Sequence, residues 1–116
     1  MSQNWHSLIA IGDFPGEGKL AALIGGWHVL VARIDGGFHA VNDRCTHQGA
    51  RLSAGKIRRN AAMCPLHGAR FDMATGQCIG GAYPDLRSFA LRETDGMIEI
   101  AIPDQPPLVG ETPISL

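Results

Sequence analysis

Two short segments of the chain combine cysteine with histidine, the residue types that bind transition metals through sulfur and nitrogen. Cys45 and His47 lie two positions apart, and sixteen residues separate His47 from Cys64, which is followed by His67. Thiolate sulfur suits zinc and iron–sulfur centres, whereas imidazole suits zinc, iron and copper. The donor types therefore predict a metal centre and leave zinc and iron–sulfur both open.

The spacing within the segments narrows the choice of metal. Neighbouring ligands of one zinc ion are usually separated by two to four residues, and Cys45 and His47 are closer together than that. We infer that each segment gives its cysteine to one metal ion and its histidine to a second. A zinc-binding structural module, or four unlinked core residues, is the alternative interpretation.

The pattern C-T-H, sixteen residues, C-P-L-H-G resembles the ligand segments of Rieske proteins, whose clusters have two histidines in place of two cysteines on one iron. Gly49 and Gly68 follow the ligands, where a tight turn would bring backbone amides toward the cluster. Residues 80–89, GGAYPDLRSF, resemble the third, proline-containing loop that shields the cluster in this family, a role that falls to Pro84. The resemblance implies one Rieske-type [2Fe–2S] cluster bound by Cys45, His47, Cys64 and His67.

The charge of such a cluster and its neighbouring residues predict a low reduction potential. A cluster with two thiolates and two neutral imidazoles is neutral when oxidised, so its potential lies above that of a four-thiolate cluster, which is a dianion. Relative to high-potential Rieske proteins, Ala50 and Leu66 replace a disulfide pair, and Ala69 and Phe71 replace Ser and Tyr. Without those two hydroxyl donors, we expect the low end of the Rieske range, about −150 mV.

These substitutions resemble the ferredoxins that serve ring-hydroxylating dioxygenases, and that resemblance implies a route for electrons. The donor would be an NAD(P)H-dependent flavin reductase, and the acceptor would be a terminal oxygenase that hydroxylates an aromatic compound. The chain itself would catalyse no step on the substrate, because a mononuclear iron centre needs two histidines and a carboxylate from a larger domain. A Rieske-like small subunit of a nitrite reductase is the alternative within the family. A membrane-anchored quinol-oxidising complex is disfavoured by the missing disulfide positions and N-terminal anchor.

Length and composition limit the fold and the partners. The chain has 116 residues, of which 45% are apolar and 18% charged, and this composition predicts a single globular domain over residues 1–116. A net charge of −1 gives no reason to expect nucleic acid. Neither a membrane span nor a secretory signal is recognisable. Three cysteines form an odd count without disulfide spacing, which favours a reducing cytoplasm.

Short hydrophobic periods with Gly or Asp-Gly breaks predict an all-β domain. Residues 26–34 are apolar on both alternating faces, as in a strand covered on both sides, and a turn at Asp35-Gly36-Gly37 would lead into a return strand over 38–42. Residues 88–93 and 97–102 predict a second hairpin with one core face. The family resemblance implies an antiparallel β sandwich with a small cluster-binding subdomain.

Two further segments complete the predicted organisation. Residues 43–87 form the cluster-binding insert, in which 57–59 and 61–63 are possible short strands around a turn at Asn60. The tail over residues 103–116 is rich in proline, which cannot donate ladder hydrogen bonds, so we expect an extended strap over the surface rather than a strand or helix.

A run of basic residues occupies the region of the predicted ligands. Between residues 44 and 71 there is no acidic residue, and the basic ones are Arg44, Arg51, Lys56, Arg58, Arg59 and Arg70. We hypothesise that the cluster tip is electropositive and steers toward acidic patches on redox partners, with a merely solvated face as the alternative.

The remaining candidate residues have structural interpretations. Cys78 has no paired histidine and is predicted to be a buried small hydrophobe. The aromatic residues Trp5, Trp27, Phe38 and Phe89 are expected to lie in the core rather than to relay electrons. His6, His28 and His39 are expected to be surface or packing residues.

Overall fold

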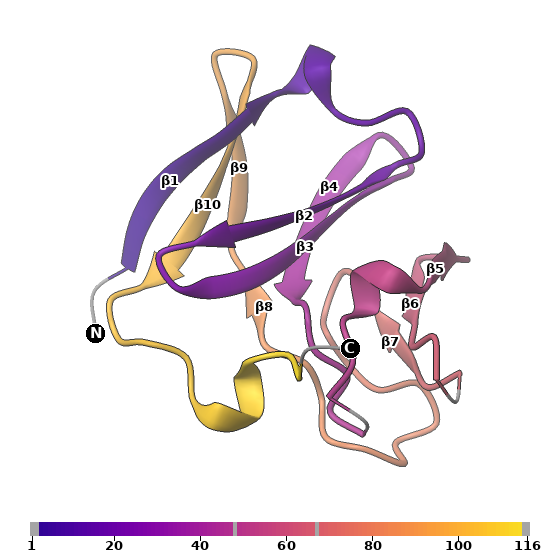
Figure 1. Ribbon diagram of the computed structural model, residues 1–116. Coiled ribbons are helices and arrows are strands. Elements are labelled where there is room, and N and C mark those ends of the chain that lie inside the picture. Colours follow the sequence, from indigo (N-terminus) through magenta and orange to yellow (C-terminus); the bar gives the residue numbers. More distant parts are fainter. Residues whose placement is uncertain (1–2, 48, 67, 115–116) are drawn as a thin grey trace.

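The computed structural model describes residues 3–47, 49–66 and 68–114, whose strands form three antiparallel sheets (Figure 1). The first sheet has the order β1-β10-β9, with β1 at Gln3–Ala10, β10 at Met97–Pro103 and β9 at Leu91–Thr94. The second has the order β2-β3-β4-β8, with β2 at Lys19–Ile24, β3 at Trp27–Ile34, β4 at Gly37–Asn42 and β8 at Ser88–Phe89. The third, a small sheet, contains β5 (Lys56–Arg58), β6 (Ala61–Met63) and β7 (Arg70–Asp72).

Three short 3-10 turns accompany the strands: η1 (Ile11–Asp13), η2 (Leu52–Ala54) and η3 (Val109–Glu111). Within the described ranges there is no α-helix, so the predicted all-β class is confirmed. No helix of this part of the chain has the length and apolar character to cross a membrane.

Strand β3 contributes side chains to both hydrophobic cores of the molecule. Trp27, Val29 and Val31 pack with residues of β10, including Ile98 and Ile100, in the core of the two larger sheets. The alternate residues Leu30 and Ala32 belong to a second core, which contains residues of the small sheet and both cysteine loops. This double burial explains why residues 26–34 are apolar on both faces, and it confirms the predicted strand.

Asp-Gly pairs make the turns of both predicted hairpins. Asp35 and Gly36 have φ angles of 51° and 81°, and Asp95 and Gly96 have 50° and 80°. Two consecutive residues with positive φ form the turn that matches the twist of a two-stranded ribbon. The turn of the small sheet is similar, with Arg59 and Asn60 at 48° and 67°.

The predicted strand over residues 88–93 is divided between two sheets. Its first part, β8, pairs with β4, whereas its second part, β9, pairs with β10. The division falls at Ala90, whose carbonyl oxygen accepts a hydrogen bond from the amide of Ala101 at 2.9 Å. This segment therefore links the two larger sheets.

The N-terminal region holds strands that the sequence did not predict, and one of them overturns the core assignment of Trp5. Strand β1 pairs with β10 at the edge of its sheet, and its first three residues, Gln3 to Trp5, are exposed. Trp5 is 41% exposed, and the guanidinium of Arg92 lies 4.0 Å from the centroid of its ring. The predicted burial is confirmed for Trp27, Phe38 and Phe89. Strands β2 and β7 were also missed.

Candidate metal centre

Both predicted cysteine ligands lie in loops that leave the ends of strands. Cys45 follows β4 by three residues, and Cys64 directly follows β6. Their exposed fractions are 0% and 2%, and both belong to the same buried cluster with Leu52 and Phe71. Two loops far apart in the sequence thus bring their thiols into one water-excluding environment.

The two cysteine loops have the same length and the same backbone hydrogen bonds. The amide of Cys45 donates to the oxygen of Ala50 at 2.8 Å, and the amide of Gly49 donates back to the oxygen of Cys45 at 2.8 Å. In the second loop, Cys64 donates to Ala69 at 2.7 Å and Gly68 to Cys64 at 3.1 Å. Gly49 and Gly68, at equal distance from their cysteines, have φ angles of 76° and 73°. A side chain would strain the backbone at these positions, which explains why glycine occupies both of them.

The histidines of the predicted ligand set come from the same two loops. His47 is exposed, and its ring stacks on that of Tyr83 with the centroids 4.0 Å apart and the planes inclined by 12°. His67 lies outside the described residues. The structure therefore places three of the four predicted ligands: two buried sulfurs and one exposed imidazole.

The proline-containing loop contacts the first cysteine loop, next to Cys45. The hydroxyl of Thr46 donates to the carbonyl oxygen of Pro84 at 2.6 Å, and Tyr83 makes the stack with His47. At the base of this loop the amide of Leu86 donates to Gly76 at 2.7 Å. The loop predicted to shield the site thus covers the outer side of the first cysteine loop.

Cys78 is buried, as predicted for a cysteine that acts as a small hydrophobic residue. Its exposed fraction is 2%, and it packs in the same buried cluster as Cys45 and Cys64. The amide of Cys78 donates to the carboxylate of Asp85 at 2.9 Å. All three cysteines lie in described parts of the chain, and none of them is in a disulfide.

The sequence did not predict a set of hydrogen bonds that connects the residues on either side of the first cysteine loop. Asp43 is 2% exposed, and its two carboxylate oxygens accept hydrogen bonds from the amide and hydroxyl of Ser53 at 2.8 and 2.6 Å. From β2, the ammonium of Lys19 donates to the carbonyl oxygens of Ser53 and Gly55 at 2.8 and 2.6 Å. A buried carboxylate requires such partners. The signal in the sequence was Asp43 itself, an acidic residue two positions before Cys45.

The histidines outside the two loops do not add to the centre. His6, His28 and His39 lie on β1, β3 and β4 and are partly exposed, as expected for surface or packing residues.

The donor set fits an iron–sulfur or zinc centre. Two thiolates buried among apolar side chains need a compensating positive charge, and a metal or cluster supplies it. An imidazole two residues after the first cysteine adds a nitrogen donor of the kind that iron and zinc accept. The neighbouring Ala69 and Phe71 are 9% and 0% exposed, and neither side chain can donate a hydrogen bond to a cluster sulfur.

Comparison with known proteins identifies the relatives of this arrangement. The profile of the Rieske [2Fe-2S] domain matches residues 4–90. The anthranilate 1,2-dioxygenase ferredoxin subunit of Burkholderia cepacia is 34% identical over 100 residues, which cover 84% of this chain and 92% of that protein.

Two solved structures show the same fold. The structure described as a complex of reduced oxygenase and oxidized ferredoxin in carbazole 1,9a-dioxygenase contains a chain with a TM-score of 0.74 and 26% identity, covering 82% of this chain and 99% of that chain. A putative NADH-dependent nitrite reductase small subunit from Mycobacterium tuberculosis has a TM-score of 0.78, with coverage of 87% and 96%. At 23% identity, the second likeness shows the fold alone.

Proposed function

Because this chain belongs to the Rieske [2Fe-2S] domain family, we propose that it is the single-electron carrier of an aromatic-ring-hydroxylating dioxygenase system. Its electrons come from an NAD(P)H-dependent flavin reductase and pass to a terminal oxygenase. The family implies one Rieske-type [2Fe–2S] cluster, which supplies a reversible one-electron change at iron when bound. The carrier itself catalyses no step on the aromatic compound and works in the cytoplasm, a location that the disulfide-free cysteines support.

We assign the cluster ligands to Cys45, His47, Cys64 and His67. The observation that carries this assignment is the match between the two cysteine loops, which have the same spacing from cysteine to glycine and the same backbone hydrogen bonds, and which bury both cysteines in one apolar cluster. Paired loops suit a cluster with one iron bound by two cysteines and one bound by two histidines, since each loop supplies one sulfur and one nitrogen.

The other residues of the site control access to the ligands. Burial of Cys45 and Cys64 keeps water away from the sulfurs. The exposed ring of His47 gives electrons a short path to a docked protein, because it joins the buried site to the surface. Its stack on Tyr83, together with the hydrogen bond from Thr46 to Pro84, fixes the loop that carries this path.

Likeness to the ferredoxin subunit of an anthranilate dioxygenase over most of both chains supports the assignment to a dioxygenase system. A small subunit of a nitrite reductase would instead remain attached to a large catalytic chain. Purification of the untagged protein from its source cells distinguishes the two functions, because a free carrier elutes at its own mass of 12.4 kDa or a small multiple of it.

The decisive experiment is EPR of the anaerobically purified protein before and after dithionite, with iron and acid-labile sulfide measured on the same sample. We expect a silent oxidised form and, after reduction, a rhombic signal with a mean g below that of an all-thiolate [2Fe–2S] cluster. Zinc without iron, and no signal on reduction, would replace the carrier with a zinc-binding structural module.

Two cysteine variants test the ligand assignment with a matched control. Cys64 and Cys78 are both 2% exposed and belong to the same buried cluster, so serine substitution perturbs packing to a similar degree. We expect Cys64→Ser to lose the iron, sulfide and visible absorption, and Cys78→Ser to keep them. Equal loss in both variants would show that packing, rather than ligation, accounts for the effect.

A further inference from the structure

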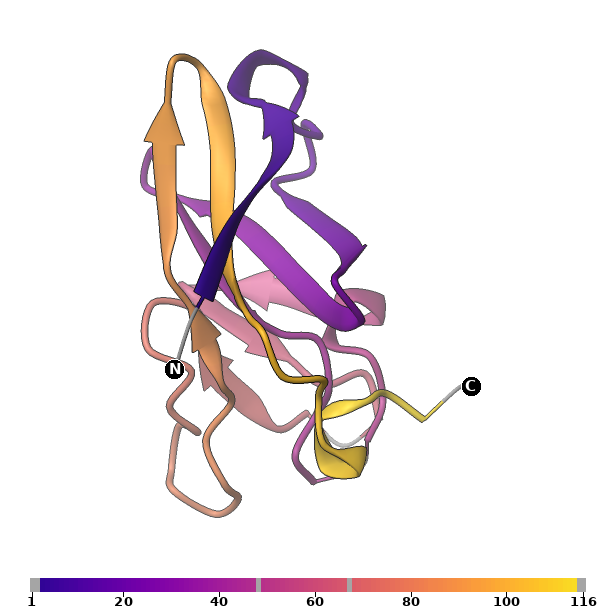
Figure 2. The ribbon, with the colours of Figure 1, turned by 90° about the vertical axis from the view of Figure 1, so that its left-hand side faces the viewer.

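The last described residues of the C-terminal tail contact the first cysteine loop. After β10 ends at Pro103, the chain passes along the end of the molecule that carries the cysteine loops and the small sheet (Figures 1 and 2). The family match covers residues 4–90 and does not extend to this segment. Its role has to be worked out from its own contacts.

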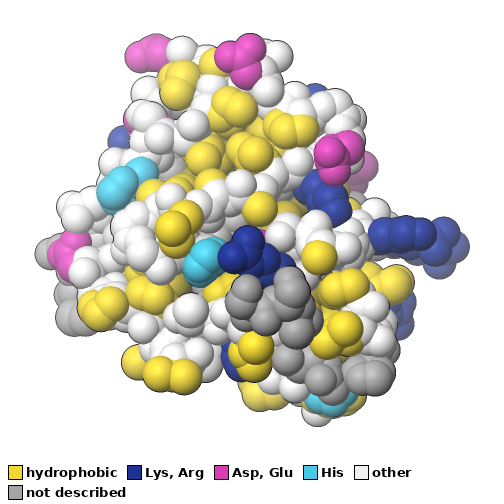
Figure 3. Space-filling model, in the orientation of Figure 1, with side chains coloured by type: hydrophobic (Ala, Val, Ile, Leu, Met, Phe, Trp, Pro, Cys, Tyr) yellow, Lys and Arg dark blue, Asp and Glu magenta, His cyan; other side chains and the backbone are white. Residues whose placement is uncertain are grey.

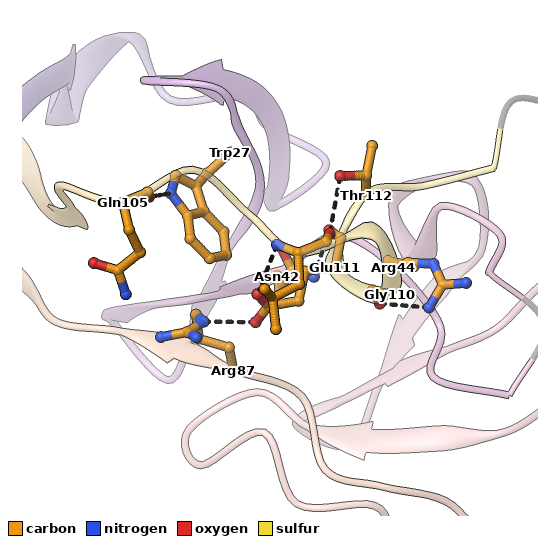
Figure 4. Close-up of polar contacts among 9 residues, drawn as sticks. Trp27, Asn42, Arg44, Arg87, Gln105, Gly110, Glu111 and Thr112 are labelled. Carbon is orange, nitrogen blue, oxygen red and sulfur yellow. Dashed lines mark hydrogen bonds and ion pairs between the residues drawn. The ribbon is translucent and has the colours of Figure 1, made fainter.

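The first part of the tail is fixed to the second sheet. The indole nitrogen of Trp27 donates to the carbonyl oxygen of Gln105 at 3.1 Å (Figure 4). The side-chain amide of Asn42 donates to the backbone carbonyl oxygen of Glu111 at 3.0 Å (Figure 4). The carboxylate of Glu111 also forms an ion pair with Arg87 at 2.7 Å. These contacts attach the tail near the end of β4, immediately before the Cys45 loop.

Turn η3 gives the tail a defined shape between its anchors. The amides of Glu111 and Thr112 donate to the carbonyl oxygens of Leu108 and Val109 at 2.9 and 3.3 Å. The Glu111 side chain also accepts a hydrogen bond from the amide of Leu108 at 3.2 Å. The carboxylate of Glu111 therefore both stabilises the turn, through the amide of Leu108, and pairs with Arg87.

The last part of the tail holds both ends of the Cys45 loop. At the start of the loop, the Arg44 guanidinium donates to the carbonyl oxygen of Gly110 (Figure 4). At its end, the amide of Ile114 donates to the carbonyl oxygen of Gly49 at 2.9 Å. The Ile114 side chain packs so closely that a Cβ added to Gly49 would lie 2.7 Å from its Cδ1.

The second cysteine loop provides an internal comparison. Gly68 has the same backbone conformation as Gly49, but a Cβ added there would meet no described atom within 4 Å. The described part of the tail therefore covers the loop of Cys45 and His47, and it makes no such contact with the corresponding glycine of the other loop. The two loops thus have matching backbones but differ in their contacts with the tail.

We propose that residues 110–114 are a positioning strap that fixes the Cys45–His47 loop toward the cluster, an inference that rests on the proposed function. Arg44 and Gly49 flank the two ligands, and the strap bonds to both. With the strap in place, the sulfur of Cys45 and the ring of His47 keep one orientation. Without it, the loop opens more often, which would admit water and disturb one cysteine ligand and one histidine ligand, while the ligands of the other loop keep their positions.

The test compares the holoprotein with a variant truncated after Pro107 and with Ile114→Ala. Val109→Ala is the matched control, because Val109 lies in the same tail and is 92% exposed. We expect truncation to speed the loss of visible absorption in the presence of an iron chelator by about tenfold, since the hydrogen bonds to both ends of the loop are lost. Ile114→Ala should show a smaller increase, and Val109→Ala should behave as the unmodified protein.

Reduction potential and EPR separate positioning from general stability. We expect the truncated protein and Ile114→Ala to show shifted g values and a shifted potential while their circular dichroism stays folded. Unchanged g values, potential and cluster retention in both variants would overturn the proposal. If the truncated chain does not fold, Ile114→Ala decides the question. A full-length protein without iron would instead refute the proposed function.

Discussion

At the scale of single residues, the side chains beside the two buried sulfurs set how easily the site accepts an electron. Ala69 and Phe71 follow Cys64 in the sequence and are both buried, as a residue that donates a hydrogen bond to the cluster would have to be. Neither of them has a hydroxyl group. Hydrogen bonds to cluster sulfurs stabilise the reduced state because reduction increases the negative charge there. Their absence agrees with a carrier of low potential.

Restoring one hydroxyl should raise the reduction potential. We expect Phe71→Tyr or Ala69→Ser to shift it upward by about 60 mV, the one-electron equivalent of about 1.4 kcal/mol. Spectroelectrochemical titration of the holoprotein measures the shift. Ala61→Ser is the control, because Ala61 is 4% exposed, lies at the end of β6 farther from Cys64, and is not part of the buried cluster that contains Ala69 and Phe71. An equal shift in the control would assign the effect to added polarity rather than to a directed hydrogen bond.

At the scale of elements, the site depends on how the cysteine loops are attached to the sheets. Strand β4 leads directly into the Cys45 loop, and β6 leads into the Cys64 loop. Turn η2, which follows the first loop, is connected to β2 through Lys19 and to the end of β4 through Asp43. The small sheet is thus joined to the larger ones by polar contacts as well as by the shared core.

The Lys19 contact should contribute measurably to the free energy of unfolding. Its ammonium donates to two backbone carbonyl oxygens, and hydrogen bonds from a charged group are worth about 1.5–3 kcal/mol. We expect Lys19→Met to lower the stability by about 2 kcal/mol, measured by urea unfolding. Lys56→Met is the control, because Lys56 is exposed on β5. A loss of similar size in the control would remove the special role of the Lys19 contact.

At the scale of the whole molecule, positive charge gathers to one side of the predicted ligands. Lys56, Arg58, Arg59 and Arg70 are exposed on the small sheet and its turn, and Figure 3 shows Lys and Arg side chains projecting at the position of β5. A groove beside the Cys64 loop is lined by Lys56, Arg58, Met63 and Pro65. Four of the six basic residues of this run thus lie on the small sheet and its turn beside the second loop, whereas Arg44 and Arg51 flank the first loop in the sequence.

This charge should make electron transfer sensitive to salt. We expect stopped-flow reduction by anionic dithionite to slow as ionic strength rises, and reduction by the methyl viologen radical cation to speed up, because salt screens attraction and repulsion alike. Arg58→Glu should weaken both trends. Arg33→Glu should not, because Arg33 pairs with Phe38 near the turn of the β3–β4 hairpin, away from the cysteine loops. Rates with dithionite that are flat or rising would contradict the hypothesis.

Local sequence patterns determined the features that depend on neighbouring residues. Asp-Gly pairs specify both long hairpins because their backbone angles are set within the turn itself. Apolar residues on both alternating faces of residues 26–34 predicted the double burial of β3. The equal spacing from each cysteine to its glycine likewise fixed the shape of both loops, since their hydrogen bonds close within five residues.

Contacts between distant residues were decided only by the tertiary structure. Strand β1 finds its partner in β10, and this pairing leaves Trp5 at a sheet edge rather than in the core. Lys19 meets Ser53, and Ile114 covers Gly49, across long stretches of chain. A residue's local pattern records which conformations its own backbone favours, whereas these contacts depend on which surfaces the completed sheets bring together. The residue types of the site can therefore be predicted from the sequence, whereas the tertiary contacts that support its first loop cannot.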